Sequence, residues 1–179
     1  ATTVAEYVEA LLATPRFCRQ VTHHRVLEAV SPEYGEPGRP WNAAMRTVLD
    51  AASVRSLYAH QSLAVDLVRA GKDIVVATHT ASGKSFTYNL PVIERFVADP
   101  EATALYIFPL KALAQDQLNA FRALTAHWPQ DARPKAAIYD GDTTGHFRKK
   151  IRNAPPQVLI TNPEMLHLGI LPFHEKWAT

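Results

Sequence analysis

The triplet Gly83-Lys84-Ser85 holds the residue types that bind a nucleotide phosphate. It ends a loop of small residues (THTASGKS, residues 78–85) that follows the β-branched run Ile74-Val75-Val76 and leads directly into a helical pattern. A strand, a loop and a helix in this order turn backbone N–H groups and a helix N-terminus towards a bound phosphate. In such a loop the Lys reaches the β- and γ-phosphates, and the Ser hydroxyl ligates Mg²⁺. The spacing therefore predicts a nucleoside triphosphate site with Lys84 on the phosphates and Ser85 on Mg²⁺.

Two further side chains near this loop are candidates for nucleotide contact. Gln61 stands near the start of the helical pattern Tyr58–Ala70, which Gly71 ends just before the loop. Its amide carries a donor and an acceptor, as reading an adenine edge requires, although a solvated helix position is the commoner explanation of an isolated Gln. His79 lies inside the loop, within reach of a bound nucleotide.

Four strand–helix repeats are predicted around the loop. After the run at 74–76, buried strands are expected at residues 103–108, 135–139 and 157–161, each followed by a helical segment. Near-continuous apolar strands that alternate with helices indicate a parallel sheet covered on both faces. Ligands bind such sheets at the carboxyl ends of the strands. The four segments after the strands should therefore share one edge: THTASGKS, FPLKALAQ, YDGDTT and TNPEML.

Several helices are predicted in detail from their apolar spacing. Residues 4–13 and 41–52 form helical patterns in the first part of the chain, separated by the Pro- and Gly-rich loop 31–40. In the helix that starts at Tyr58, the spacing places Leu63, Leu67 and Val68 inward. In the helix after Ser85, Pro91 is expected to produce a kink or an irregular start. Thr143 or Thr144 is expected to cap a short basic helix that includes Arg148, Lys149, Lys150 and Arg152, for which a solvated face and a phosphate-binding face remain equally good explanations.

The composition limits the class of protein. A chain of 179 residues with 47% hydrophobic content supports one full core, and its net charge of +2 permits a nucleic-acid partner without requiring one. Cys18 is the single cysteine, so no intramolecular disulfide forms, which fits a reducing compartment. The apolar runs are of strand length, and the N-terminus lacks the pattern of a signal peptide. These features predict a soluble cytoplasmic protein with no membrane partner.

Six segments in a fixed order resemble the first RecA-like domain of superfamily-two (DEAD/DEAH-box-type) ATP-dependent helicases. They are YAHQ, TASGKS, PLKALAQDQ, YDGDT, TNPEMLH and GILPFHEKW. Within the superfamily, these segments are most similar to bacterial DNA-repair helicases of the mitomycin-repair-factor type. The resemblance covers residues 57–179 well and residues 1–56 only loosely. It implies an α/β fold: a partial RecA-like P-loop NTPase domain at 57–179 with helices on both faces of a parallel sheet, preceded by a mostly helical accessory segment at 1–56.

The resemblance also implies roles for individual residues. It makes Gln61 the residue that reads adenine, with Tyr58 or Leu57 as a ring contact, and it makes ATP and Mg²⁺ the cofactors. The loop residues that it places on the nucleotide are Thr80, Ala81, Ser82, Gly83, Lys84 and Ser85. The residues that it places on a single nucleic-acid strand are Pro109, Lys111, Ala112, Gln115, Gly141, Asp142, Thr143, Thr161, Asn162, Pro163 and Glu164. Backbone N–H groups and helix N-termini suit this task because they bind phosphate without reading bases. The implied partners are single-stranded or forked DNA, with RNA left open, and the remaining helicase domains of a parent chain.

The sequence departs from the helicase pattern in two ways. Thr78 occupies the place of the first Gly of the generic phosphate loop, and Ala81 stands where many helicases have Gly. More importantly, hydrolysis requires an acidic pair after an apolar strand, and no two adjacent acidic residues follow Lys84. We expect this pair and the second RecA-like domain with its arginine fingers to lie beyond Thr179. We therefore expect a portion of a DNA-repair helicase that binds ATP without turning it over. The alternatives are a P-loop kinase or transferase acting on a small molecule, and a nucleic-acid-binding module that does not hydrolyse ATP.

Overall fold

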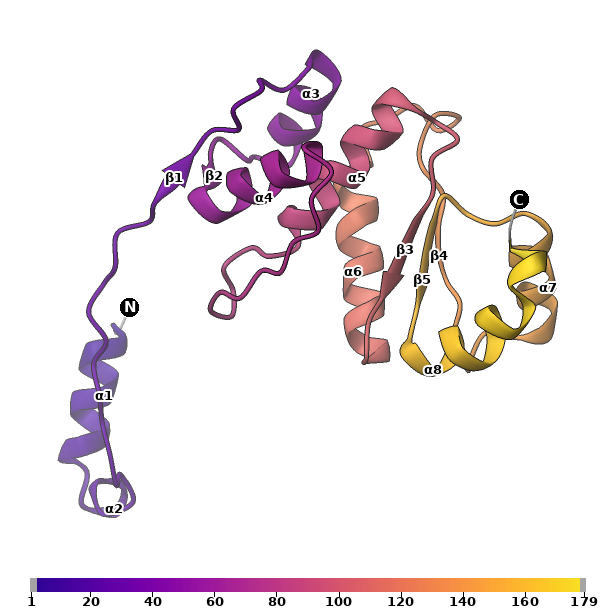
Figure 1. Ribbon diagram of the computed structural model, residues 1–179. Helices are drawn as coiled ribbons and strands as arrows, with labels where there is room; N and C mark the ends of the chain where they lie inside the picture. Colours follow the sequence, from indigo (N-terminus) through magenta and orange to yellow (C-terminus); the bar gives the residue numbers. More distant parts are fainter. Residues whose placement is uncertain (1–2, 178–179) are drawn as a thin grey trace. The chain divides into compact units, whose positions relative to one another are not determined.

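The computed structural model describes residues 3–177, and the chain divides into two compact units between Pro32 and Glu33 (Figure 1). The first unit contains α1 (Val4–Ala13) and the single turn α2 (Pro15–Cys18), which pack on each other. Thr3 caps α1, because its hydroxyl accepts from the Glu6 N–H and its own N–H donates to Glu6 Oε2. The predicted helix at 4–13 is confirmed, and none of its described residues is buried.

The domain boundary expected between residues 56 and 57 stays a prediction. The second compact unit begins earlier, so residues 33–56 pack together with the residues that follow them. Residues 1–2 and 178–179, which the expected domains include, lie outside the described residues.

A three-stranded parallel sheet forms the centre of the second unit. Its strands are β3 (Ala104–Ile107), β4 (Ala136–Ile138) and β5 (Val158–Thr161), in the spatial order β3-β5-β4. The register pairs Tyr106 with Ile160 and Ile138 with Ile160. Three of the four predicted strands and the parallel arrangement are thus confirmed.

The fourth predicted strand, at residues 74–76, is wrong for this structure. Residues 72–79 have no regular secondary structure, and Val75 is 97% exposed. β-branched residues favour strands only where a neighbouring strand completes the hydrogen-bond ladder. Within the described residues, no strand pairs with this segment.

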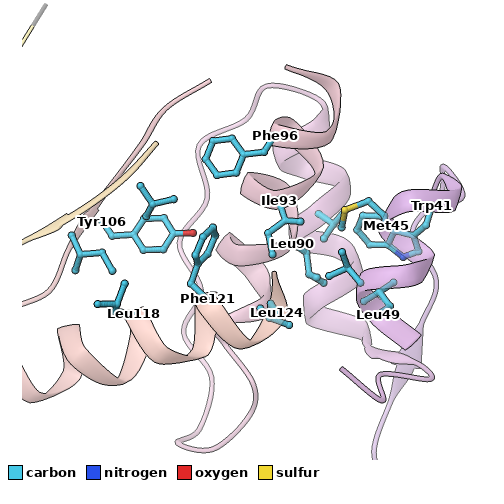
Figure 2. Close-up of a cluster of buried hydrophobic side chains, with 14 of the residues drawn as sticks. Trp41, Met45, Leu49, Leu90, Ile93, Phe96, Tyr106, Leu118, Phe121 and Leu124 are labelled. Atoms are coloured by element: carbon cyan, nitrogen blue, oxygen red, sulfur yellow. The ribbon is translucent and has the colours of Figure 1, made fainter. Parts of the chain in front are cut away.

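The main core lies between one face of the sheet and helices α3 (Ala43–Ala51), α5 (Phe86–Ala98) and α6 (Lys111–Leu124). Figure 2 shows the buried side chains that these elements bring together, from Trp41 and Met45 near α3 to Tyr106 on β3. Phe121 of α6 is fully buried and meets Tyr106 and Phe96 edge to face. Each of the aromatic pairs adds stability beyond the area that it buries.

A smaller core covers the opposite face of the sheet. Leu159 points away from the main core and packs with Tyr139, with Ile151 of α7 (Gly145–Asn153) and with Ile170. Ile170 ends a π-helical turn (Leu166–Ile170) that follows the short helix α8 (Pro163–Met165), and a 3₁₀ segment (Leu171–Lys176) comes next. Val158 and Ile160 face the main core instead, so β5 is buried on both sides as the sequence predicted.

Helix α4 (Ala59–Arg69) precedes the phosphate loop in the chain, and its predicted burial is wrong. The side chains at Leu63, Leu67 and Val68 are exposed, whereas α4 buries Gln61, Ser62, Ala64 and Val65. Helix α4 packs chiefly on α5 and on the short antiparallel pair β1 (Tyr34–Gly35) and β2 (Leu57–Tyr58). Leu63 and Leu67 instead line a 220 Å³ cavity together with residues 74–78.

A charged cluster fixes α4 to α5. Arg69 forms two hydrogen bonds to Glu94, at 2.9 and 2.8 Å, and its guanidinium lies over the Trp41 ring at 4.4 Å. Both charged side chains are largely buried, which makes the pair part of the packing.

Helix α5 continues through Pro91, which lies inside it. The predicted kink or irregular start therefore does not interrupt the helix. Among residues 3–177, no helix combines the length and the apolar character needed to cross a membrane.

Candidate nucleotide and nucleic-acid site

The phosphate loop folds around the ammonium group of its own Lys84. Lys84 Nζ donates to the backbone oxygens of Thr78, at 2.8 Å, and of His79. The hydroxyls of Thr78 and Ser82 lie 3.3 Å from the same nitrogen and 2.6 Å from each other. Oxygen atoms thus surround the cation, in the manner in which a phosphate would also solvate it.

The end of the loop carries the free donors that an anion site needs. Within the described residues, no recorded hydrogen bond uses the N–H groups of Gly83, Lys84 or Ser85. Helix α5 begins directly after them, and the Ser85 side chain makes no capping bond. The N–H groups and the positive end of α5 fit a phosphate, and the uncommitted Ser85 hydroxyl fits a Mg²⁺ ligand. Within residues 3–177, no group of three or more His, Cys, Asp or Glu side chains is placed to hold a metal ion.

Two residues of the loop adopt the left-handed backbone conformation. Gly83 has φ +70° and Ala81 has φ 59°. A side chain at position 83 would also collide with α4, because an added Cβ would lie 2.5 Å from Gln61 Nε2. The Gly of the motif is thus required twice, by its φ angle and by the approach of Gln61. Ala81 carries a modest strain that Gly would not.

Gln61 is bound to the loop. Its side chain is buried; Oε1 accepts from the Tyr58 N–H at 2.9 Å, and Nε2 donates to Gly83 O at the same distance. Both ends of the amide are therefore used within the chain. Contact with adenine would exchange at least one of these bonds, and this role stays a prediction.

An aromatic stack adjoins Gln61 and includes a residue that the sequence did not reveal. The Tyr58 ring lies 5.5 Å from that of Tyr34 and 5.8 Å from that of His60, nearly parallel to both. Pairing of β1 with β2 sets Tyr34 opposite Tyr58. Only this tertiary pairing identifies Tyr34, since residues 31–40 read as a linker.

The carboxyl ends of β3, β4 and β5 lie together, as the parallel topology requires. Lys111 begins α6 just after β3, and its Nζ lies 2.6 Å from Asp142 Oδ2 in the turn after β4. The hydrogen bond to Asp142 raises the pKa of Lys111, and the charges of Asp142, Asp140 and Glu164 raise it further. Three of the four predicted segments thus meet at one edge.

The turn after β4 is held by a dense set of hydrogen bonds. Asp140 Oδ1 accepts from the N–H groups of Asp142 and Thr143 and from the Thr143 hydroxyl. Arg148 of α7 donates to the backbone oxygens of Asp140 and Gly141, at 3.1 and 2.9 Å. Thr144 caps α7, which confirms one of the two predicted caps. The basic helix is therefore attached to the same edge through Arg148.

The third segment uses two of its polar residues for structure. Thr161 is 1% exposed, and its hydroxyl donates to Tyr139 O at 2.7 Å, so it joins β5 to the chain after β4. Asn162 Oδ1 accepts from the Met165 N–H and caps α8. The nucleic-acid contacts expected of both side chains stay predictions.

The other predicted strand-contacting residues lie along the same edge or on the first turns of α6. Gln115 is exposed and donates to Asn119 one turn later. The rest of this set follows a strand directly or begins a helix: Pro109, Ala112, Gly141, Pro163 and Glu164.

Hydrogen bonds from two tyrosine hydroxyls to amide side chains link α5, the helix after the phosphate loop, to its neighbours. Tyr88 of α5 donates to Gln117 of α6 at 2.6 Å, and Tyr106 of β3 donates to Asn89 of α5 at 2.8 Å. The elements that lead out of the two candidate sites are thus joined beneath them. The sequence pattern marked these positions only as helix and strand residues.

Comparison with known proteins places the chain among helicases. The family model for DEAD/DEAH box helicases matches residues 58–178. ATP-dependent helicase HRQ1 of Saccharomyces cerevisiae is 35% identical over 98% of this chain and 16% of its own length. The crystal structure of the DUF1998 helicase MrfA bound to DNA superimposes with a TM-score of 0.82 at 35% identity, covering 99% of this chain and 24% of that one. A second MrfA structure, bound to DNA and AMPPNP, gives a TM-score of 0.75 at 38% identity over 84% of this chain and 21% of that one. The chain thus spans less than a quarter of the length of each of these proteins.

Proposed function

Because the chain belongs to the DEAD/DEAH box helicase family, we propose that it is the ATP-binding portion of an ATP-dependent DNA helicase that moves along single-stranded nucleic acid. The observation that carries this proposal is the phosphate loop, in which Lys84 and free backbone N–H groups stand at the start of α5. Structures of the similar helicase MrfA contain DNA, and one of them also contains AMPPNP. They support the proposal that this chain binds a nucleic acid and ATP. The family match leaves no observation in favour of a small-molecule kinase.

ATP would bind with its phosphates at residues 80–85. Lys84 would exchange its bonds to Thr78 and His79 for bonds to phosphate oxygens, and Ser85 would ligate Mg²⁺. Gln61 and Tyr58 would hold the base beside the loop, with His79 at its mouth. Bound Mg²⁺ would supply charge neutralisation of the phosphates.

The nucleic-acid strand would lie along the shared edge, with phosphates near Lys111 and the turn at 141–143. Exposed backbone and a cation at this edge bind a phosphate chain without reading its bases, as a translocating enzyme requires. Single-stranded or forked DNA is the proposed partner. Residues 57–179 form the proposed partial RecA-like domain, and residues 1–56 form the accessory segment.

The chain by itself is proposed to bind ATP without turnover. Hydrolysis needs acidic groups that position Mg²⁺ and water, and no adjacent acidic pair follows Lys84. In the full-length parent helicase, the rest of the first RecA-like domain would supply this pair, and the second RecA-like domain would supply the arginine fingers.

Substitution of Lys84 tests the proposal. In the full-length parent, Lys84→Ala should abolish ATP-driven unwinding and leave single-strand binding largely intact, because the strand edge is built from other segments. Lys72→Ala is the matched control, since Lys72 is exposed just before the loop and makes no recorded side-chain bond. Unwinding that survives Lys84→Ala would refute the assigned loop function. Steady ATPase activity of the 179-residue chain, lost on Lys84→Ala, would refute the proposed absence of turnover.

The resemblance to DNA-repair helicases supports a role of the full-length parent helicase in DNA repair. We propose that this role is carried out in the cytoplasm. A strain that lacks the gene of the full-length helicase should then be more sensitive to a DNA-crosslinking agent than the unmodified strain. A returned copy of the gene should restore resistance only if it encodes Lys84. Equal sensitivity of the two strains would contradict this role.

A further inference from the structure

We propose that Asp142 sets the affinity for a nucleic-acid strand by occupying Lys111 until a backbone phosphate displaces it. This inference rests on the proposed function, in which the strand lies along the shared edge. It changes the role of Asp142 from a direct strand contact to a competitor of the strand.

The contact between the two side chains is open to an incoming strand. Lys111 Nζ and Asp142 Oδ2 are 2.6 Å apart, with 56% and 74% of the two side chains exposed. A carboxylate and a phosphate present equivalent charged oxygens to an ammonium group. A carboxylate also repels phosphate, so Asp142 cannot itself be a favourable phosphate contact. The arrangement fits a cation that is held by one anion and exchanged to another.

The position of Asp142 is fixed by its turn. Asp140 Oδ1 accepts three hydrogen bonds from Asp142 and Thr143, while Arg148 holds the backbone oxygens of Asp140 and Gly141 from α7. The Asp142 carboxylate itself accepts only from Lys111 among the recorded bonds of the described residues. Its removal should therefore free Lys111 and leave the turn intact.

The other acidic groups near Lys111 are less suited to this role. Asp140 and Glu164 both affect the pKa of Lys111, but through charge rather than through a hydrogen bond. The Asp140 carboxylate is committed to the turn. Lys111 forms one ion pair in the described structure, and its partner is Asp142.

The exchange has a defined signature in salt dependence. Each phosphate contact to a single strand steepens the dependence of log K on log salt by about 0.7. With Asp142 present, Lys111 loses one anion as it gains another, so the pair contributes little to this slope. Without the carboxylate, Lys111 should contribute a full phosphate contact.

Strand binding by the full-length parent without nucleotide tests the inference. Fluorescence anisotropy of labelled single-stranded DNA would be titrated over a range of salt for the parent, Asp142→Asn, Lys111→Met and the double variant. Asp142→Asn should tighten binding by about two- to fivefold at low salt, because exposed ion pairs are weak, and should steepen the slope by about 0.7. Lys111→Met should weaken binding, and in that background the gain from Asp142→Asn should shrink to the small effect of removing a carboxylate that repels phosphate.

Asp116→Asn is the matched control. Asp116 is an exposed carboxylate on α6, the helix that begins with Lys111, and it forms no ion pair in the described structure. Equal gains from Asp116→Asn and Asp142→Asn, or a gain from Asp142→Asn that keeps its full size with Lys111→Met, would show general repulsion and overturn the inference. Unchanged affinity in Asp142→Asn would overturn it as well. If neither the unmodified helicase nor any variant binds the strand, the proposed function fails. If the unmodified helicase binds the strand and the variants give one of the contradicting results above, only the inference fails.

Discussion

Replacement of Gly83 by Ala is expected to destabilise the chain far more than the same change at Gly71. Both glycines have φ +70°, a conformation that costs a residue with a side chain about 1–2 kcal/mol. At Gly71 nothing lies within 4 Å of an added Cβ, so only this backbone cost applies. At Gly83 the Cβ would lie 2.5 Å from Gln61 Nε2.

The additional cost at position 83 follows from the bonds of Gln61. The amide is the flexible end of its side chain and would move, but Gln61 is only 3% exposed and has no solvent to enter. Moving it breaks the bonds to the Tyr58 N–H and to Gly83 O, each worth about 1 kcal/mol. The total for Gly83→Ala is therefore about 3–4 kcal/mol, against about 1–2 kcal/mol for Gly71→Ala.

Urea unfolding of the chain, followed by far-UV circular dichroism, would measure both losses. In a Gln61→Ala background the collision disappears, so Gly83→Ala should then cost no more than Gly71→Ala. Equal losses at the two glycines with Gln61 present would refute the claim that α4 holds the phosphate loop. A loss at position 83 that is independent of Gln61 would refute the assigned mechanism.

Two further expectations concern the packing beneath the sites. Glu94→Ala should lower the free energy of unfolding in urea by about 2–3 kcal/mol, because it leaves the largely buried Arg69 without its main partner. Arg95→Ala, which removes an exposed ion pair, should lower it by less than about 0.5 kcal/mol. Similar losses in the two variants would show that burial does not decide the strength of an ion pair here. Tyr106→Phe should cost about 1–3 kcal/mol, because the buried Asn89 Oδ1 loses its donor. Burial raises the pKa of Tyr106 above its ordinary value of 10.0, with the charge of Tyr88 adding to the effect. Stability should therefore be complete below pH 10 and fall as the pH rises above it, since only the unfolded state releases the proton there. Unfolding curves of the unsubstituted chain and of Tyr106→Phe would show a smaller loss of stability at high pH in the variant. An equal loss in both would contradict the assignment to Tyr106.

The sheet could be predicted because its signals are local. Each strand combines β-branched or aromatic residues with a helix as the next element along the chain, and the apolar runs at 103–108, 135–139 and 157–161 correspond to β3, β4 and β5. Since parallel strands share their carboxyl edge, the topology implied that the segments carrying Lys111 and Asp142 lie at the same edge. The pairing of these two side chains with each other was not implied, because charge signs alone do not give distances.

The features that the sequence did not predict depend on partners far along the chain. Leu63 and Leu67 have helical spacing, but α4 buries the side that carries Gln61, Ala64 and Val65, where Gln61 donates to Gly83 O of the phosphate loop. Tyr34 gains its meaning from pairing with Tyr58 across a linker. Residues 74–76 have the composition of a strand and no neighbour to complete one.

The phosphate loop therefore takes its shape from a helix rather than from a strand. No strand fixes residues 72–79, whereas Gln61 reaches from α4 to Gly83 O and Lys84 closes the loop onto Thr78 and His79. Gln61 and Lys84, two of the side chains proposed to bind ATP, are thus already bonded within the chain. In the proposed function, nucleotide binding is therefore an exchange of hydrogen bonds, and its net free energy is smaller than the new contacts alone would give. The proposed contact of Gln61 with the base would then connect base recognition to the shape of the loop.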